Sequence, residues 1–374
     1  MIIEQSKPIL TTGVNQSVSF DEFKSEVITD YILACLSREV SLTGRKEVLT
    51  GKAKFGSFAD GKELPQIALA KVFENGDFRA GYYRDQTFAL ATGIVTVEQL
   101  FGQLYANPSL EEDPHSGGRQ MNNHFATRNL HPDGSWKNLT KQKNSAADNS
   151  PTASQMIRAL GLAMASKKYR ALQDSIGENN FSINGNEICF ATIGDASTSE
   201  GLFWEVINAG GVLQVPLIVS IWDDGYGISV PKKLQTTKSS ISEVLKGFQR
   251  DEKGNGYDIY VVKGWNYPQL VATYKMAADK TRKTHIPAIV HVEELTQPQG
   301  HSTSGSHERY KSAERLQWEK EHDCNYKFKQ WILENKIATQ DEIDKIESDA
   351  KKIVADQKKI SWNKFHQPIL DEIK

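Results

Sequence analysis

The most regular hydrophobic pattern of the chain lies between residues 188 and 231. Two unbroken apolar runs, residues 188–193 and 217–222, flank a segment that starts near Glu200 and carries apolar residues at helical spacing. Unbroken apolar runs of this length are typical of strands in a parallel sheet that is covered on both faces. The pattern therefore predicts a strand–helix–strand unit. A right-handed crossover would place the carboxyl ends of both strands at the same edge of the sheet.

An acidic turn follows each of these two strands. Gly194-Asp195 ends the first strand, and Asp223-Asp224-Gly225-Tyr226 follows the second. Ligands of open α/β sheets bind outside the carboxyl ends of the strands, and Mg²⁺ takes oxygen ligands that it shares with substrate phosphates. We therefore expect Asp195 and Asp224 to converge on a divalent cation. Solvated or helix-capping aspartates would explain the same residues.

The same periodicity arguments predict the elements around this unit. We expect further strands at 259–262 and 288–295, and helices at 21–40, 64–73, 150–169 and 268–280. Residues 38–51 have the composition of a connector and residues 122–150 that of a long loop.

Together these elements predict an α/β fold with a mostly parallel sheet covered by helices on both faces. The sheet domain is expected within residues 61–310, between a helical extension at 1–60 and a charged helical tail at 311–374. Thr339 and Glu342 in that tail fit a capping box.

Composition narrows the class of protein. The chain has 374 residues, a net charge of −2 and 39% hydrophobic residues, which is typical of a large globular protein and argues against nucleic acid or a membrane as the main partner. The scattered cysteines Cys35, Cys189 and Cys324 indicate a reducing compartment. The N-terminal residues show no targeting pattern, so we expect a cytoplasmic protein; a chain after removal of an import signal would look the same.

Several motifs of this chain resemble one enzyme family. They are TSEG at 198–201, DDGYGISVP at 223–231, HSGGRQM at 115–121 and GHSTS at 300–304. From about Gly61 to Tyr310 the sequence resembles the alpha subunits of thiamine diphosphate-dependent 2-oxo acid dehydrogenases, most closely the branched-chain members. The resemblance implies the thiamine diphosphate-binding fold and Mg²⁺ as the ion that anchors the cofactor.

The resemblance also implies roles for individual residues. Mg²⁺ would be held by Asp195, Asp224 and the backbone of Tyr226, while Tyr83 and Arg84 would contact the diphosphate. His301, with a pKa near neutrality, and Ser302 would lie at the reacting centre. Further cofactor contacts would come from Ser150, Thr152, Gly194, Ala196 and Ser197. Ser154 and Gln155 would bind a K⁺ ion.

The implied function is oxidative decarboxylation of a branched-chain 2-oxo acid, with acyl transfer to lipoyl groups of an acyltransferase core. A Glu that activates the cofactor lies on a beta subunit in this family, so a beta chain in a heterotetramer, or a fused beta-like domain, is expected. Alternatives are a pyruvate or acetoin dehydrogenase subunit and a catalytically degenerate assembly protein. The chain departs from the family pattern at three positions: Ala196 for Gly, Asp224 for Asn and Trp222 for an Arg that touches the diphosphate. Asp224 and Trp222 both weaken anion binding and favour the last alternative, whereas Ala196 is a small change that restricts only the backbone φ.

Overall fold

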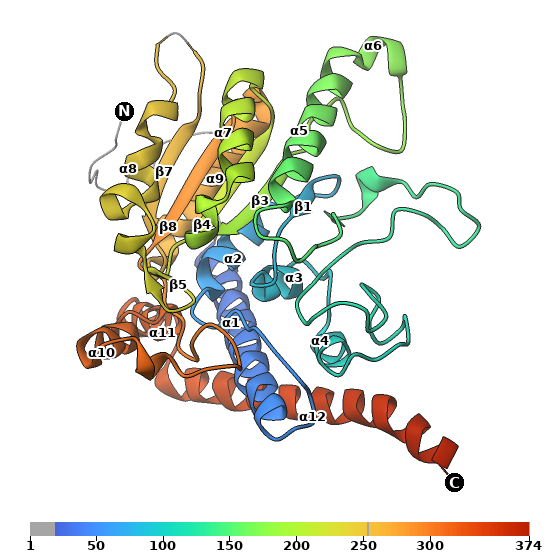
Figure 1. Cartoon of the computed structure of the whole chain (residues 1–374), viewed down its shortest axis with the longest axis vertical. Coiled ribbons are helices and arrows are strands. Elements are labelled where there is room, and N and C mark those ends of the chain that lie inside the picture. Colours follow the sequence, from blue (N-terminus) through green and yellow to red (C-terminus); the bar gives the residue numbers. More distant parts are fainter. Residues whose placement is uncertain (1–18, 253, 374) are drawn as a thin grey trace.

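The computed structural model describes residues 19–252 and 254–373, so the expectation about the first residues of the chain lies outside the described part (Figure 1). Its centre is a sheet of six strands in the order β2-β1-β3-β4-β8-β7, and each pairing is parallel. β3 (Cys189–Gly194) and β4 (Leu217–Trp222) lie in the middle, with Gly194 paired to Trp222. This sheet confirms the predicted α/β fold.

The other strands are β1 (Phe78–Ala80), β2 (Asn144–Ser145), β7 (Asp258–Lys263) and β8 (Ala288–Glu293), and an antiparallel hairpin of β5 (Tyr226–Gly227) with β6 (Val230–Pro231). β1 and β2 were not expected from the sequence. They are too short to show a hydrophobic period, and β2 lies inside the segment that the sequence indicated as a loop.

Alternate residues of the strands face two different cores. Ala191, Val219 and Ile289 pack with residues of α5 (Gln155–Ala171) and α7 (Gly201–Leu213). Phe190 and Val290 pack on the opposite side, with residues of α2 (Glu63–Lys71) and α9 (Tyr267–Thr284). Burial on both faces explains why these strands read as unbroken apolar runs. Figure 1 shows α5 and α7 together on one side of the sheet.

Long helices at the two ends of the described chain pack against each other. α1 (Phe20–Leu49) and α12 (Gln340–Ile373) are in contact, and α12 also covers α4 (Val97–Leu104), with Val354 and Trp362 in the shared core (Figure 1). The predicted capping box at Thr339 and Glu342 is present. The predicted connector at 38–51 was wrong, because α1 continues to Leu49 and buries Val40, Ser41 and Gly44 against its neighbours.

The remaining helices are shorter than α1 and α12. They are α3 (Gln86–Ala91), α6 (Gln173–Ile176), α8 (Ile241–Val244), α10 (Ala313–Glu321) and α11 (Cys324–Glu334). Short 3-10 helices lie at η1 (Leu139–Lys141), η2 (Ala196–Ser199), η3 (Lys232–Leu234), η4 (Thr237–Ser239), η5 (Leu245–Phe248) and η6 (His307–Arg309).

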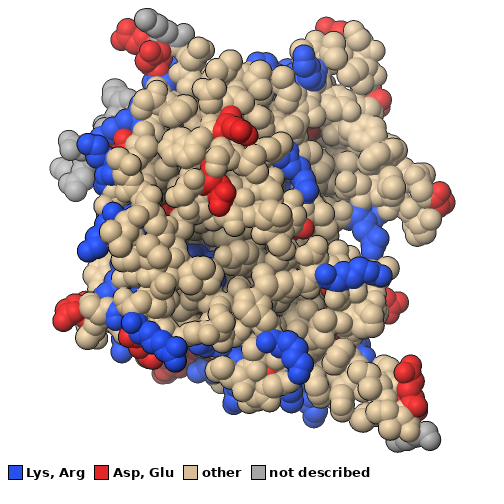
Figure 2. All heavy atoms as spheres, viewed as in Figure 1, with Lys and Arg blue, Asp and Glu red and all other residues tan. Residues whose placement is uncertain are grey.

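The surface is mixed in charge. On the face shown in Figure 2, basic and acidic side chains are scattered among larger uncharged areas. Among the described residues, none of the helices combines the length and the apolar character that a bilayer crossing needs.

Candidate active site at the strand ends

Asp195 follows β3 directly and is the buried, unpartnered carboxylate of the site. Its side chain is 5% exposed, and its Oδ2 has no hydrogen-bond partner among the described residues. Burial, reinforced by the nearby Asp223 and Asp224 carboxylates, holds the pKa of Asp195 well above its usual range. A buried carboxylate oxygen without a partner is costly, so this position lacks a positive charge or a proton donor.

Asp224 arrives at the same edge from β4, as the sequence predicted, but it already has a cationic partner. Lys62 Nζ donates to Asp224 Oδ2 at 2.7 Å, and the Tyr226 backbone N–H donates to Oδ1 at 3.1 Å. Burial opposes ionisation of Asp224, yet the positive charges of Lys62, Arg84 and Lys311 together outweigh it and the pKa of Asp224 is lowered. The carboxylate is therefore charged and oriented.

Asp223, between Trp222 and Asp224, has a structural environment of its own. It accepts hydrogen bonds from Lys232 Nζ at 2.7 Å and from His291 Nε2 at 3.0 Å. Burial opposes its ionisation, but these two partners lower the pKa of Asp223 to about 2. Its charge is thus balanced within the protein, and Asp195 alone of the three aspartates has an unpartnered oxygen among the described residues.

Arg84 and His301 are brought together although 217 residues separate them. Arg84 Nη2 donates to His301 Nδ1 at 2.9 Å and to the His301 carbonyl at 2.8 Å, and Nη1 donates to the Phe58 carbonyl at 2.6 Å. A guanidinium can only donate, so Nδ1 is the acceptor and the proton of the neutral imidazole is on Nε2. Burial, followed by the Arg84 charge, lowers the pKa of His301 to about 4. The expected pKa near neutrality was therefore wrong.

Tyr83 and Ser302 flank this pair. The Tyr83 ring meets the His301 ring edge to face at 6.3 Å between centroids, and the Arg84 guanidinium lies 5.1 Å from the Tyr83 ring centre. Ser302 is buried, and its hydroxyl lies 2.8 Å from the Ser304 hydroxyl, while Arg45 holds the Ser302 carbonyl. The structure thus fixes the loop around His301 by its backbone as well as by Arg84.

The start of α5 lies beside the end of β3. The Gln155 side-chain amide donates to the Thr192 carbonyl at 2.9 Å, which ties the helix to the strand. The Ser154 hydroxyl bonds with Asn149 and with the Pro151 carbonyl, whereas Ser150 and Thr152 are exposed. These contacts neither require nor exclude the K⁺ site, which stays a prediction.

Two of the three departures from the family pattern have local explanations. Trp222 is 1% exposed and packs in the core, where its indole N–H donates to Asp85 Oδ1 at 3.3 Å. Ala196 is absent from the residues with positive φ, so a side chain costs no backbone strain here. It packs against Gly227, where a Cβ would come within 2.7 Å of the Ala196 methyl group. Ala196 therefore fits without strain, and Trp222 fills the core.

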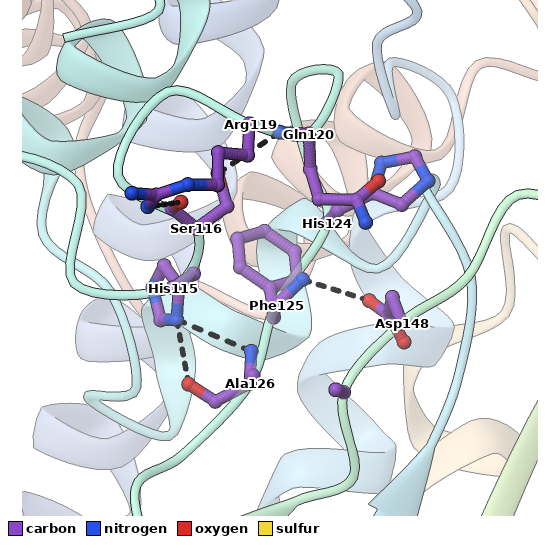
Figure 3. Close-up of a pocket in the computed structure, with 9 residues that line it drawn as sticks. His115, Ser116, Arg119, Gln120, His124, Phe125, Ala126 and Asp148 are labelled. Atoms are coloured by element: carbon purple, nitrogen blue, oxygen red, sulfur yellow. Dashed lines mark hydrogen bonds between the residues drawn. The ribbon is translucent and has the colours of Figure 1, made fainter. Parts of the chain in front are cut away.

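A buried ion network connects the sheet end to a neighbouring hollow. The Arg79 side chain is fully buried and bonds Asp85 at 2.8 Å and Asp148 at 3.0 and 3.1 Å. Asp85 in turn accepts from Thr192 and Trp222. Asp148 lines the hollow, which is about 230 Å³ in volume and formed by the loop His115–Gln120 and by residues 124–126. Figure 3 shows His115 and Asp148 approaching the backbone of residues 125 and 126 from two sides. The predicted loop at HSGGRQM therefore borders a cavity that is linked to the site through Arg79.

Sequence reasoning missed the cations that hold the second acidic turn. Besides Lys62, Arg315 Nη2 on α10 donates to the Asp224 carbonyl at 2.8 Å. Arg315 and Lys311 lie 5.4 and 5.2 Å from the Tyr226 ring centre, and both bond the buried Glu319. Asp224, Tyr226, His301 and Lys311 line a second small cavity. The segment around 311, which the sequence indicated as the start of a tail, thus supports the site.

Comparison with known proteins decides the family. The model of the family described as "Dehydrogenase E1 component" matches residues 36–369. The chain belongs to this family. The family is thiamine diphosphate-dependent, and the resemblance stated from the motifs is confirmed.

Individual relatives agree with this assignment. The chain is 25% identical over 337 residues to the 2-oxoisovalerate dehydrogenase subunit alpha of Bacillus subtilis (strain 168). This alignment covers 90% of the chain and 89% of the relative. It is 26% identical over 329 residues to 2-oxoisovalerate dehydrogenase subunit alpha 1, mitochondrial, of Arabidopsis thaliana, covering 86% of this chain and 60% of the relative. It is 30% identical over 192 residues to the pyruvate dehydrogenase E1 component subunit alpha of Rickettsia felis (strain ATCC VR-1525 / URRWXCal2), covering 50% of this chain and 54% of the relative.

The residues at the strand ends fit the family's anionic cofactor together with a hard cation. The Asp195 oxygen without a partner is the type of ligand that such a cation takes, and each Asp224 oxygen keeps a lone pair after its one protein hydrogen bond. Lys311 lines the second small cavity together with Asp224 and supplies positive charge there, and Arg84 is hydrogen-bonded to His301, which lines the same cavity.

Proposed function

We propose that this chain is the alpha component of a 2-oxo acid dehydrogenase and binds thiamine diphosphate through Mg²⁺ at the ends of β3 and β4. The observation that carries this proposal is the buried Asp195 Oδ2, which lacks any partner among the described residues and lies close enough to Asp224 for the two charges to interact. A divalent cation would satisfy that oxygen, and the cation would then be shared with a diphosphate.

Each residue of the site has a stated task in this proposal. Asp195, Asp224 and the backbone of Tyr226 hold the Mg²⁺, while Tyr83 and Arg84 lie on the diphosphate side. His301 presents a neutral Nε2–H, which can donate a hydrogen bond to negative charge that develops on the substrate. Thiamine diphosphate, when bound, supplies the electron sink that lets the bond to the carboxylate carbon break. A K⁺ ion at Ser154 and Gln155 belongs to the same proposal.

The substrate and partners are inferred from the relatives. The 2-oxoisovalerate dehydrogenase relatives support a branched-chain 2-oxo acid, and a beta chain or fused beta-like domain would complete the cofactor site. A lipoyl-bearing acyltransferase core would accept the acyl group. We also propose a cytoplasmic location. The rickettsial relative favours pyruvate as the second candidate substrate, since 30% of the aligned residues are identical.

Steady-state lipoyl acylation tests this proposal. The purified chain is assayed alone and with a beta-type partner, with 3-methyl-2-oxobutanoate and with pyruvate. We expect turnover only with the partner, and faster with 3-methyl-2-oxobutanoate. A strong preference for pyruvate would show that the second candidate is the substrate. The absence of turnover with every partner and substrate would favour the assembly protein.

A further inference from the structure

The Lys62 ammonium is buried beside the proposed metal ligands and is held by three acceptors. Its Nζ donates to Asp224 Oδ2 at 2.7 Å, to Gln297 Oε1 at 2.7 Å and to the Thr296 carbonyl at 3.1 Å. The side chain is 1% exposed. All three N–H groups of the ammonium are therefore used, so Lys62 cannot turn toward a ligand without losing one of these bonds.

The backbone brings Lys62 to this position by a close approach. Gly61 has φ +87, and a Cβ at Gly61 would lie 2.3 Å from the Thr296 carbonyl oxygen. Glycine alone tolerates both the conformation and the contact. The loop before α2 therefore packs closely against the segment after β8, and the Lys62 side chain extends from this loop to Asp224.

The charges of the site identify what Lys62 does. Asp223 is balanced by Lys232 and His291, and Asp224 by Lys62, whereas Asp195 Oδ2 has no partner among the described residues. The site therefore presents one uncompensated carboxylate to a cation instead of two. A positive charge fixed 2.7 Å from an Asp224 oxygen also repels any cation that this carboxylate binds.

We propose that Lys62 is a positioning and charge-setting residue of the cation site: it holds the Asp224 carboxylate in place and limits the affinity of the Asp195–Asp224 pair for a free divalent cation. This inference rests on the proposed function, because it assumes that Asp195 and Asp224 bind a divalent cation. Limited affinity for the free ion makes cation binding depend on the diphosphate, whose negative charge offsets the Lys62 ammonium.

Substitutions that remove one charge or both separate this role from simple support of the fold. Lys62→Gln keeps a hydrogen-bond donor but removes the charge, so Asp224 becomes uncompensated and should bind a free cation more tightly. Asp224→Asn removes the carboxylate charge and leaves the ammonium buried without a counter-ion, which should weaken cation binding and destabilise the chain. The double variant removes both charges, and should recover stability relative to Asp224→Asn alone.

The experiment is a titration of the full-length chain with Mn²⁺ alone, followed by the electron paramagnetic resonance signal of the free ion. We expect Lys62→Gln to bind Mn²⁺ about tenfold more tightly than wild type, Asp224→Asn about tenfold more weakly, and the double variant within about threefold of wild type. Lys71→Gln is the matched control: Lys71 ends α2, the helix that Lys62 precedes, and its ion pairs are with Glu26 and Asp30 of α1, so its loss should leave Mn²⁺ affinity unchanged.

The outcomes distinguish this inference from the proposed function. Equal Mn²⁺ affinity of wild type and Lys62→Gln, or weaker binding by Lys62→Gln, overturns the role of Lys62 and leaves the metal site in place. Failure of wild type and both Lys62 variants to bind Mn²⁺ overturns the metal site itself and this inference with it. If Lys62→Gln does not fold, the double variant tests the role of Lys62 instead. A Mn²⁺ affinity that differs more than tenfold from that of wild type would then overturn the claim that Lys62 balances the charge of Asp224.

Discussion

The Arg84 guanidinium donates a hydrogen bond of 2.9 Å to Nδ1 of His301. The same guanidinium group also binds the His301 carbonyl, so it fixes both the side chain and the loop that carries it. Because Nδ1 is occupied by a donor, a second proton cannot be accepted there unless Arg84 moves. His301 is therefore a fixed donor through Nε2 and not a group that exchanges protons near neutral pH.

The pKa of His301 provides the first prediction. We expect the imidazole of His301 to stay neutral down to a pKa of about 4. In Arg84→Met this pKa should rise, but stay below 6.5, because burial is the larger cause of the shift and remains. Histidine ¹³Cε1 NMR over pH 3.5–8 measures it, with the His301 signal assigned by its loss in His301→Gln. A midpoint near 6.5 in wild type would contradict this account of the pair.

The same shift predicts a pH dependence of stability. Between pH 6.5 and about 4 the unfolded chain takes up a proton at His301 that the folded chain does not, so His301 lowers the stability of the fold as the pH falls through this range. His301→Gln should therefore lose less stability than wild type between pH 6.5 and 4.5. Urea unfolding at several pH values measures the difference. If the free energy of unfolding falls equally with pH in the two proteins, His301 contributes nothing to the pH dependence of stability.

Arg79 is expected to be essential for the stability of the sheet end. Its guanidinium is fully buried between Asp85 and Asp148, and removing it would leave two buried carboxylates without their partner. Arg79→Leu should lower the free energy of unfolding by about 3–5 kcal/mol. The matched control is Arg128→Leu at an exposed position, with an expected change within about 0.5 kcal/mol. Similar losses in the two variants, measured by urea unfolding, would show that the network is not stabilising.

The central part of the fold could be predicted from the sequence because its residues are buried on both faces. β4 begins and ends where the apolar run does, and α7 follows its helical spacing. β2 could not be predicted in this way, since only Asn144 and Ser145 form it and their burial comes from polar contacts with neighbouring segments. The connector at 38–51 was misjudged because its polar residues are buried by contacts with distant segments: Ser41 bonds Gln86 of α3, and Glu47 bonds Tyr105 at the end of α4.

The site was predictable where a strand end defines it and not where distant segments meet. Asp195 and Asp224 follow from strand ends in a parallel sheet, whereas Lys62 reaches Asp224 across 162 residues of sequence. A signal was present at Asp224, which stands where the resemblance implies Asn, because an added buried charge needs an opposite charge nearby. In the structure, the negative charge of Asp224 is paired with the Lys62 ammonium.

The docking of α12 leads to a prediction about the C-terminal helix. Val354 is fully buried in the core shared with α1 and α4, whereas the neighbouring Ile353 is 44% exposed. Val354→Asp would bury a charge without a partner and should detach the helix, so that trypsin cleaves the chain after the lysines of α12 at least tenfold faster. Ile353→Asp is the control and should be cleaved like wild type. Equal cleavage of both variants would contradict the packing of α12.

The binding of thiamine diphosphate tests the central claim most directly, and isothermal titration calorimetry on the chain assembled with its beta partner measures it. Wild type should bind the cofactor only when Mg²⁺ is present. Asp195→Asn should lose this Mg²⁺-dependent affinity by about a hundredfold or more, because a charged metal ligand is removed. Glu200→Gln, at an exposed position five residues along, should bind like wild type. An Asp195→Asn variant with wild-type affinity and Mg²⁺ dependence would contradict the claim that Asp195 anchors the cofactor through a metal ion.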